Sequence, residues 1–272
     1  MDINHFFHRL DEMFTQGKSP EEIDAYLCDS LTKANEERDY GAYVSIGNEM
    51  IGFYRSISQY EKCFQISEDI LMLMEELQLD GTEHFATTLL NVATGYRAAG
   101  RLNESLSYYT RALQIYEQIL QPNDYRFAGL YNNISILLEQ LNDNEKAVVF
   151  LERAMDIIDG IPEGASEQAS TRTNLALVKM KMGKVEEAEN LLQDALKRYE
   201  ALEGETSDAH YSGALAGLAE VYFKKGKYQE ALEYYDKAAQ EVKKHFGENE
   251  SYHLLLQNGE LVKKHLSSRG EC

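Results

Sequence analysis

Apolar residues recur along the chain at the spacing that places side chains on one face of a helix. Over residues 88–117 the first such stripe consists of Leu89, Val92, Ala93 and Tyr96. Gly100 interrupts the pattern, and the second stripe consists of Leu106, Tyr109, Leu113 and Tyr116. Spacings of i, i+3, i+4 and i+7 are typical of amphipathic helices, so we predict two helices joined by a turn at Gly100.

The same two-helix unit recurs, and its period can be measured from an asparagine that interrupts the helical pattern. Asn91 lies between Leu90 and Val92, and equivalent asparagines follow at Asn133 and Asn174, which are 42 and 41 residues further on. Small residues that allow two helices to approach closely repeat with it, at Ala112, Ala154, Ala195 and Ala238. Five units therefore follow one another, and we expect a solenoid of stacked helix pairs.

Both ends of the chain carry features of capping helices, which a solenoid needs because its terminal units would otherwise expose their apolar faces. Ser19, Pro20 and Glu22 provide a helix N-cap, a first-turn proline and the acid of a capping box. We therefore predict a helix pair over 1–39, with its second helix ending near Arg38. A closing helix near the C-terminus is predicted to turn its apolar residues inward, namely Leu254, Leu255, Leu261, Val262 and Leu266.

Several segments resemble a known family of helical repeats. GKYQEALEYYDKA, residues 226–238, is close to the helix–turn–helix core of tetratricopeptide repeats. GTEHFATTLLNVA (81–93) and NDYRFAGLYNNIS (123–135) are similar to the junction and first helix of the kinesin light chain type of these repeats. The resemblance covers residues 42–266. The period of 41 to 43 residues exceeds the usual ~34, so the helices or their connections are expected to be longer than standard.

The resemblance implies an all-α fold, a right-handed α–α superhelix of five to six helix pairs with a C-terminal capping helix. Three prolines and 18 glycines, without any Pro-rich or Gly/Ser-rich stretch, leave no obvious linker. We therefore expect a single domain over 1–272. Within it we expect the capping pair at 1–39, five repeats at 40–248, and the closing helix and tail at 249–272.

A second face of each first helix carries mostly small or uncharged residues. In tetratricopeptide superhelices the first helix of every pair lines the concave surface, so the resemblance implies that this face forms the floor of a groove. The predicted groove residues are Thr87, Asn91, Thr94, Arg97, Asn132, Asn133, Ile136, Gln140, Ser170, Asn174, Leu177 and Lys181. Such a floor suits an extended peptide, because asparagine amides both donate to and accept from a main chain.

Two roles for the repeated asparagines stay open. In the kinesin light chain type the matching positions contact bound peptide, and the resemblance implies the same for Asn91, Asn133 and Asn174. Alternatively, their amides bond to the neighbouring repeat and hold the superhelix in register, since a buried amide needs partners. Glu49 and Gly217 occupy the first and fourth positions of the series, so the asparagines cover only its middle.

Chaperone-tail receptors of this family bind a C-terminal carboxylate with basic residues at particular groove positions. None of the corresponding positions here is basic: they are Leu90, Asn132, Thr173 and Ala216, with Thr87, Gly129, Ser170 and Gly213. We therefore expect no carboxylate clamp of that kind. Arg97, Arg172 and Lys181 lie close to the groove, and we interpret them as ordinary solvated charges.

Charge and composition restrict the partner class and the chemistry. The formal charge of −19 disfavours nucleic acid and anionic membranes as partners, because both present phosphates that a protein must neutralise. The N-terminus lacks a secretory signal pattern, and the longest apolar run, Ile70 to Met74, is too short to span a bilayer, so we expect a soluble cytoplasmic protein. His5 and His8 lie near Asp11 and Glu12 in a geometry that could hold a metal, but no third helix segment supplies an obvious ligand set. The three cysteines form no pair, and no catalytic motif is present. We predict no metal, no cofactor and no enzymatic activity.

Three functions agree with this pattern. The first, which we favour, is a non-catalytic adaptor or scaffold that binds a protein or an extended peptide in the concave groove. The second is a regulatory receptor resembling the Rap-type proteins, whose tetratricopeptide superhelix binds a small signalling peptide. The third is a structural assembly subunit, and the sequence leaves open whether the chain forms a homo-oligomer.

Overall fold

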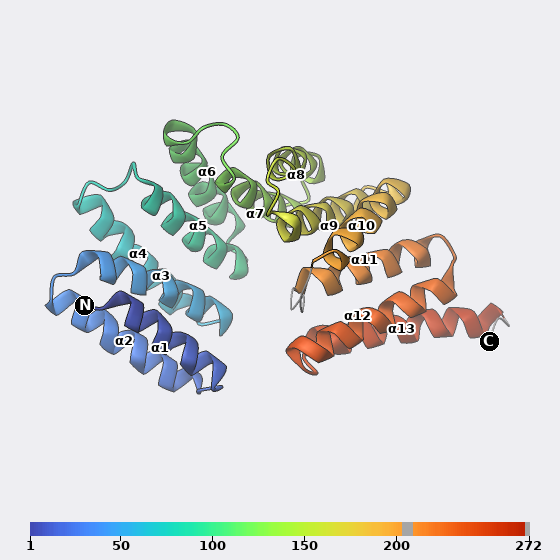
Figure 1. The fold of residues 1–272 in the computed structure, drawn as a ribbon, viewed down its shortest axis with the longest axis horizontal. Coiled ribbons are helices and arrows are strands. Elements are labelled where there is room, and N and C mark those ends of the chain that lie inside the picture. Colours follow the sequence, from blue (N-terminus) through green and yellow to red (C-terminus); the bar gives the residue numbers. More distant parts are fainter. Residues whose placement is uncertain (203–208, 270–272) are drawn as a thin grey trace. The chain divides into compact units, whose positions relative to one another are not determined.

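Every element in the described part of the chain is a helix, as the sequence predicts. The computed structural model describes residues 1–202 and 209–269 (Figure 1). The chain divides into an N-terminal unit, Met1–Pro122, and a C-terminal unit, Asn123–Cys272. In each unit successive helices pack against one another, so the predicted all-α fold of paired helices is confirmed. The end of the predicted tail, 270–272, lies outside the described residues.

The N-terminal unit consists of three helix pairs. They are α1 (Ile3–Thr15) with α2 (Pro20–Glu36), α3 (Tyr40–Ser56) with α4 (Tyr60–Glu76), and α5 (Glu83–Ala98) with α6 (Leu102–Ile119). The described residues of the C-terminal unit form α7 (Arg126–Gln140) with α8 (Asn144–Ile158), α9 (Ala165–Lys181) with α10 (Val185–Glu200), and α11 (Ala209–Lys224) with α12 (Tyr228–Phe246), followed by α13 (Glu250–Arg269). None of these described helices is long and apolar enough to cross a membrane.

Small residues let the two helices of a pair approach closely. Ala93 on α5 and Ser105 and Ala112 on α6 are fully buried, and the Ser105 hydroxyl donates to the Ala93 carbonyl oxygen at 2.8 Å. The later alanines of this series are fully buried as well, namely Ala154, Ala195 and Ala238. A larger side chain at these positions would push the helices apart, so close packing explains the repeated small residues.

The helix ends follow the local sequence signals. The Ser19 hydroxyl accepts from the backbone N–H of Glu22, and the Glu22 carboxylate accepts from the backbone N–H of Ser19, so the predicted capping box is present at the start of α2. The helix ends at Glu36, two residues before the predicted Arg38. Gly100 follows the end of α5 with φ of +76°, a conformation that glycine adopts without strain. The predicted break between the two helices is confirmed.

The closing helix is buried along one face only. Leu255, Val262 and Leu266 are buried, as predicted, but Leu254 and Leu261 are 56% and 52% exposed. The prediction that all five face inward is wrong for these two leucines. Among the described residues α13 packs chiefly against α12, and a single partner helix covers only one side of it.

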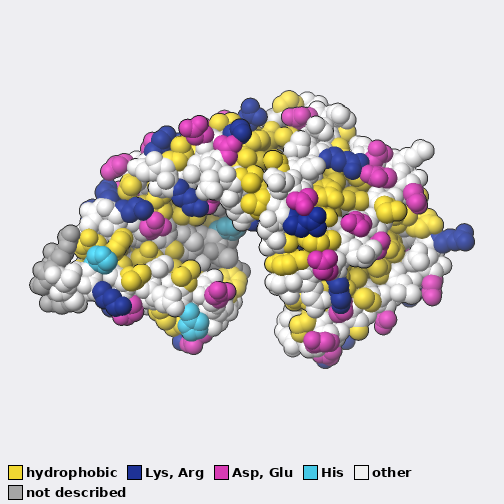
Figure 2. Space-filling view, turned by 180° about the vertical axis from the view of Figure 1, so that it is seen from behind, with side chains coloured by type: hydrophobic (Ala, Val, Ile, Leu, Met, Phe, Trp, Pro, Cys, Tyr) yellow, Lys and Arg dark blue, Asp and Glu magenta, His cyan; other side chains and the backbone are white. Residues whose placement is uncertain are grey.

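Acidic side chains are spread over the surface rather than gathered in one block. Figure 2 shows Asp and Glu side chains interspersed with Lys and Arg over the face that it displays. The chain has 46 acidic and 27 basic residues, so the charge of −19 is distributed along the molecule. A diffuse negative charge of this kind favours basic partners without marking any one site.

Candidate functional site

In the N-terminal unit one asparagine links two successive repeats. Asn48 on α3 donates from Nδ2 to Oγ1 of Thr88 on α5 at 3.0 Å. Its Oδ1 accepts from Nδ2 of Asn91, also on α5, at 2.8 Å. Thr88 and Asn91 are three residues apart and share one face of α5, so a single amide bridges both of them. The first helices of these two repeats are thereby joined through side chains.

The C-terminal unit contains the same arrangement with the same residue types. Asn132 on α7 donates to Oγ1 of Thr171 on α9 at 2.9 Å and accepts from Nδ2 of Asn174 on α9 at 3.1 Å. The other N–H of the Asn132 amide donates to the Ala128 carbonyl oxygen at 3.0 Å, which fixes the orientation of the amide. Two of the three repeated asparagines, Asn91 and Asn174, therefore bond to a neighbouring repeat.

These bonds leave part of the amide groups unused. Within the described residues the carbonyl oxygen of Asn174 and one of its N–H groups make no hydrogen bond, and the same holds for Asn91. The whole amide of Asn133 has no hydrogen-bond partner in that part of the chain, although its side chain is half-buried. Half-buried amides are generally satisfied by water or by a ligand when the protein offers no partner.

A cleft in the C-terminal unit, the C-terminal cleft, is lined by the amides of Asn133 and Asn174. Its volume is about 560 Å³, and it is bordered by α7, α9 and the connection between α8 and α9. Its polar floor consists of Asn132, Asn133, Ser170 and Asn174. Its apolar side chains are Ile136, Ile158 and Ile161, and its mouth carries Tyr125, Glu163, Glu167 and His210. The cleft therefore combines main-chain-like hydrogen-bonding groups with apolar surface, which is the usual composition of a binding site.

Two buried side chains of α9 hold the wall of this cleft in place. Nε2 of Gln168 donates to the carbonyl oxygens of Ile158 and Ile161, at 3.1 and 2.9 Å. The guanidinium of Arg172 donates from Nη1 and Nη2 to both carboxylate oxygens of Asp159, each at 2.8 Å. The end of α8 and the connection that carries Ile161 are thus anchored to α9 by four hydrogen bonds.

Arg172 is a buried ion-pair residue and not the solvated charge that the sequence analysis predicts. Its side chain is 8% exposed, and its Nε donates to the Asp194 carboxylate on α10 at 2.5 Å. Burial alone would lower the pKa of Arg172, but the hydrogen bonds and charges of Asp159 and Asp194 outweigh burial and raise that pKa. The prediction of a solvated charge is wrong. Asp159 and Asp194 lie on other segments, which only the folding of the chain brings next to Arg172 on α9.

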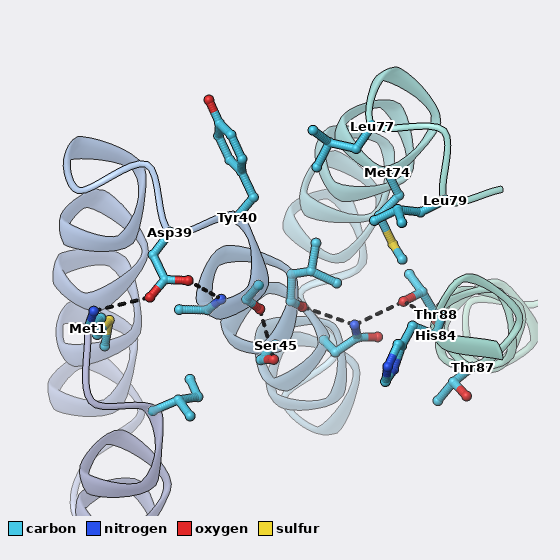
Figure 3. A pocket seen from close by; sticks show the side chains of 15 residues that line it. Met1, Asp39, Tyr40, Ser45, Met74, Leu77, Leu79, His84, Thr87 and Thr88 are labelled. Carbon is cyan, nitrogen blue, oxygen red and sulfur yellow. Dashed lines mark hydrogen bonds and ion pairs between the residues drawn. The ribbon is translucent and has the colours of Figure 1, made fainter. Parts of the chain in front are cut away.

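The N-terminal unit has a cleft in the corresponding place, the N-terminal cleft. It has a volume of about 490 Å³ and is bordered by α3, α5 and the connection between α4 and α5. Its apolar side is made by Met74, Leu77 and Leu79, and its polar residues include Asn48, His84, Thr87 and Thr88. Figure 3 shows Met74 and Leu79 next to one another, with Thr87, Thr88 and His84 on the neighbouring helix. This cleft contains the Asn48–Thr88 bond at its base.

Comparison with known proteins identifies the family of the chain that forms these clefts. The tetratricopeptide repeat family model matches residues 84–159 and 167–240, which is more than half of the chain. This chain belongs to the tetratricopeptide repeat family. Protein KINESIN LIGHT CHAIN-RELATED 3 of Arabidopsis thaliana is 23% identical to it over 215 residues, which is 78% of this chain and 32% of that protein. The chain thus spans about a third of the length of this curated relative.

Solved tetratricopeptide structures have the same fold. BtubC (BKLC) from P. vanneervenii superposes with a TM-score of 0.72 at 21% identity, over 85% of this chain and 93% of that one. NprR, solved in complex with its cognate peptide NprX, superposes with a TM-score of 0.66 at 16% identity, over 94% of this chain and 71% of that one. Together with the sequence relative, these structures confirm a tetratricopeptide solenoid of the kinesin light chain type.

The tetratricopeptide fold brings half of the predicted groove residues to the two clefts. The C-terminal cleft is lined by Asn132, Asn133, Ile136, Ser170 and Asn174, and the N-terminal cleft by Thr87. Asn91 bonds to Asn48, which also lines the N-terminal cleft. Contact of these residues with a ligand stays a prediction. Within the described residues no group of three or more His, Cys, Asp or Glu side chains is placed to hold a metal ion.

The other five predicted residues line neither cleft. The Thr94 hydroxyl shares a hydrogen bond of 2.8 Å with the Tyr109 hydroxyl, so it faces the second helix of its own repeat. Lys181 is exposed and forms an ion pair with Glu139. Three further residues complete this group: Arg97, which is half-buried with no hydrogen bond at Nε in the described chain, Gln140, which is exposed, and Leu177, which is half-buried.

The connection between α8 and α9 and the end of α8 contribute cleft residues that were not predicted from the sequence. Ile158 ends α8, and Ile161 and Glu163 follow in the connection to α9, yet all three line the C-terminal cleft. The groove was predicted from first helices only, and the connections lack the strict periodicity that made those helices visible. One signal was available: Met74, Leu77 and Leu79, which line the N-terminal cleft, occupy the same positions in their repeat as Ile158, Ile161 and Glu163. 

Proposed function

We propose that this protein is a non-catalytic scaffold that binds an extended segment of a partner protein, with the C-terminal cleft as a principal contact. The observation that supports this proposal most directly is the amide of Asn133, which lines that cleft with Asn132 and Asn174 and has no hydrogen-bond partner among the described residues. An amide has both donors and an acceptor, which is what the backbone of an extended peptide requires. The membership of the tetratricopeptide family, whose solenoids present long binding surfaces, agrees with it.

The cleft suits a peptide in size and in rigidity. A volume of about 560 Å³ accommodates a few side chains rather than a folded domain. Asn174 is held by Asn132, and the wall at Ile161 is held by Gln168. Groups that are already fixed lose little conformational entropy on binding, so a short segment can bind with useful affinity.

The decisive variant is Asn133→Ala, because it removes the unpartnered amide without breaking any hydrogen bond of the described chain. Peptides would first be selected on the intact protein from a random dodecamer display library, and their Kd measured by calorimetry. We expect Asn133→Ala to weaken the selected peptides about 5- to 10-fold, the effect of losing one or two hydrogen bonds. The free energy of unfolding should stay within about 0.5 kcal/mol of the unmodified protein.

Asn190→Ala is the matched control. Asn190 is an exposed asparagine on α10, a second helix, and does not line the cleft. This variant should bind the selected peptides with unchanged affinity. The proposal is wrong if the library yields no binder, or if the Asn133 and Asn190 variants bind equally well.

A receptor for a small peptide is the second candidate. NprR, whose structure contains its cognate peptide NprX, has a similar fold over 94% of this chain, and this likeness favours the candidate. A receptor of this kind is expected to change conformation when it binds, whereas a scaffold is not. Small-angle scattering with and without a selected dodecamer separates the two: a change in the radius of gyration supports the receptor, and an unchanged curve supports the scaffold.

A further inference from the structure

The two clefts are copies of one site that have diverged in charge. Their matching residues are separated by 83 or 84 positions in the sequence, as Asn48 is from Asn132 and Thr88 from Thr171. Both copies retain the asparagine–threonine hydrogen bond, at 3.0 Å in the N-terminal cleft and 2.9 Å in the C-terminal cleft. Two repeats of about 42 residues account for the separation, so the same part of the fold forms each cleft.

The apolar wall is retained as well. Met74 and Leu77 of the N-terminal cleft correspond to Ile158 and Ile161 of the C-terminal cleft. Met74 and Ile158 are each less than 5% exposed, so both walls rest on the core of their unit. The retained features, an amide floor and an aliphatic wall, are those that would contact the main chain and an aliphatic stem of a bound segment.

The mouth of the cleft is what has changed. Leu79 and His84 of the N-terminal cleft correspond to Glu163 and Glu167 of the C-terminal cleft. Both glutamates are exposed, and within the described residues neither carboxylate forms an ion pair. Arg126 also lines this cleft, but its guanidinium is paired with Asp124, both of whose carboxylate oxygens it bonds at 2.7 Å.

We propose that the C-terminal cleft binds a lysine or arginine side chain of the extended partner segment. This inference rests on the proposed function. The aliphatic stem of the basic residue lies along Ile136, Ile158 and Ile161, and its cationic head reaches Glu163 and Glu167 at the mouth. A long basic side chain combines these two properties, because its methylene groups are apolar and only its end is charged. The net charge of −19 further favours approach of a basic segment.

The test compares one peptide in two forms. A random dodecamer display library is selected on the unmodified protein, and the position with the strongest preference for Lys or Arg is identified. The selected peptide is then synthesised with that residue and with norleucine, which keeps an aliphatic stem but has no charge. We expect norleucine to weaken binding about tenfold at low salt, with a smaller difference at high salt.

Two charge-matched variants assign this preference to the cleft. Glu163→Gln with Glu167→Gln removes both carboxylates of the mouth and should make the two peptides bind equally. Glu186→Gln with Glu230→Gln changes the net charge by the same amount on second helices, at exposed positions that do not line the cleft. This control should retain the tenfold preference.

The results separate this inference from the proposed function. If binders show no basic position, or if the Glu163/Glu167 variant retains the preference for the basic peptide, the assignment of a basic side chain is overturned. Sensitivity of those same binders to Asn133→Ala would still support the scaffold. A library that yields no binder overturns both proposals.

Discussion

The asparagine link between repeats makes a quantitative prediction about stability. Changing Asn132 to Ala removes the hydrogen bond to Thr171 at 2.9 Å and the bond from Asn174 at 3.1 Å, both of which join α7 to α9. An intramolecular hydrogen bond contributes a net ~0.5–1.5 kcal/mol. Because Thr171 is 1% exposed, its hydroxyl cannot recover the lost bond from bulk water without rearrangement. We therefore expect Asn132→Ala to lower the free energy of unfolding by about 1–3 kcal/mol.

A double-mutant cycle isolates the asparagine pair. The free energy of unfolding of the Asn132→Ala, Asn174→Ala and double variants would be measured by urea denaturation followed by circular dichroism, with the slope m checked for constancy. The double variant should be more stable than the sum of the single effects predicts, with a coupling energy of about 0.5–1.5 kcal/mol. Asn133→Ala combined with Asn174→Ala serves as the control, because no hydrogen bond joins these two residues, and its coupling should be close to zero.

Additivity within ~0.3 kcal/mol for the Asn132/Asn174 pair would refute this reasoning. It would mean that each amide bonds to water as favourably as to the other amide, and that this hydrogen bond does not help to hold the two repeats in register. Asn48 and Asn91 provide an independent repetition in the N-terminal unit, where their bond length is 2.8 Å and the same coupling is expected.

Three further changes test other parts of the structure. An asparagine at Gly217 should destabilise the protein by about 1–3 kcal/mol, because even a Cβ there would lie 3.0 Å from a leucine side chain; urea denaturation measures this. Burial would raise the pKa of Asp24, but hydrogen bonds from Lys62 and Tyr54 outweigh it and lower that pKa. The stabilisation that the Asp24 carboxylate provides is therefore complete above its unfolded-state pKa and is lost as the pH falls through its lower folded-state pKa. Asp24→Asn should therefore make the free energy of unfolding depend less steeply on pH, measured from roughly pH 2 to 5. Arg172→Met should lower the free energy of unfolding by about 1–3 kcal/mol and also weaken dodecamer binding, since it frees the connection that forms the cleft wall; unchanged calorimetric affinity would contradict this role.

Gly217 also explains where the asparagine series stops. A Cβ at this position would lie 3.0 Å from Leu192 and 3.2 Å from Leu177, so an asparagine side chain fits only if these leucines shift. The sequence shows that the series ends at this repeat, and the close leucines on other helices are a feature that only the tertiary structure reveals. The repeat pattern thus identifies Gly217 as the equivalent of the repeated asparagines, and the packing around it accounts for a residue without a side chain there.

Helix pairs, their period and most core positions were determined by the sequence itself. The helices and their buried faces depend on residues three to seven apart, as the apolar stripe at Leu89, Val92 and Tyr96 shows. The period depends only on the recurrence of one residue type at a fixed position. The repetition of one unit strengthens the prediction, because each repeat confirms the others. The capping box at Ser19 is visible for the same reason, since its two partners are only three residues apart.

Only the tertiary structure decided which groups meet across the repeats. Asn91 bonds to Asn48 and Arg172 bonds to Asp194, partners that are 43 and 22 residues away. The sequence places Asn91 on a helix face, but the angle and distance between neighbouring helices determine whether its amide reaches another side chain. The walls of the clefts depend on the same geometry, because Ile161 reaches the amide floor only when its connection folds over α9. Periodicity thus determined the helical repeats, and the packing of one repeat on the next determined the clefts between them.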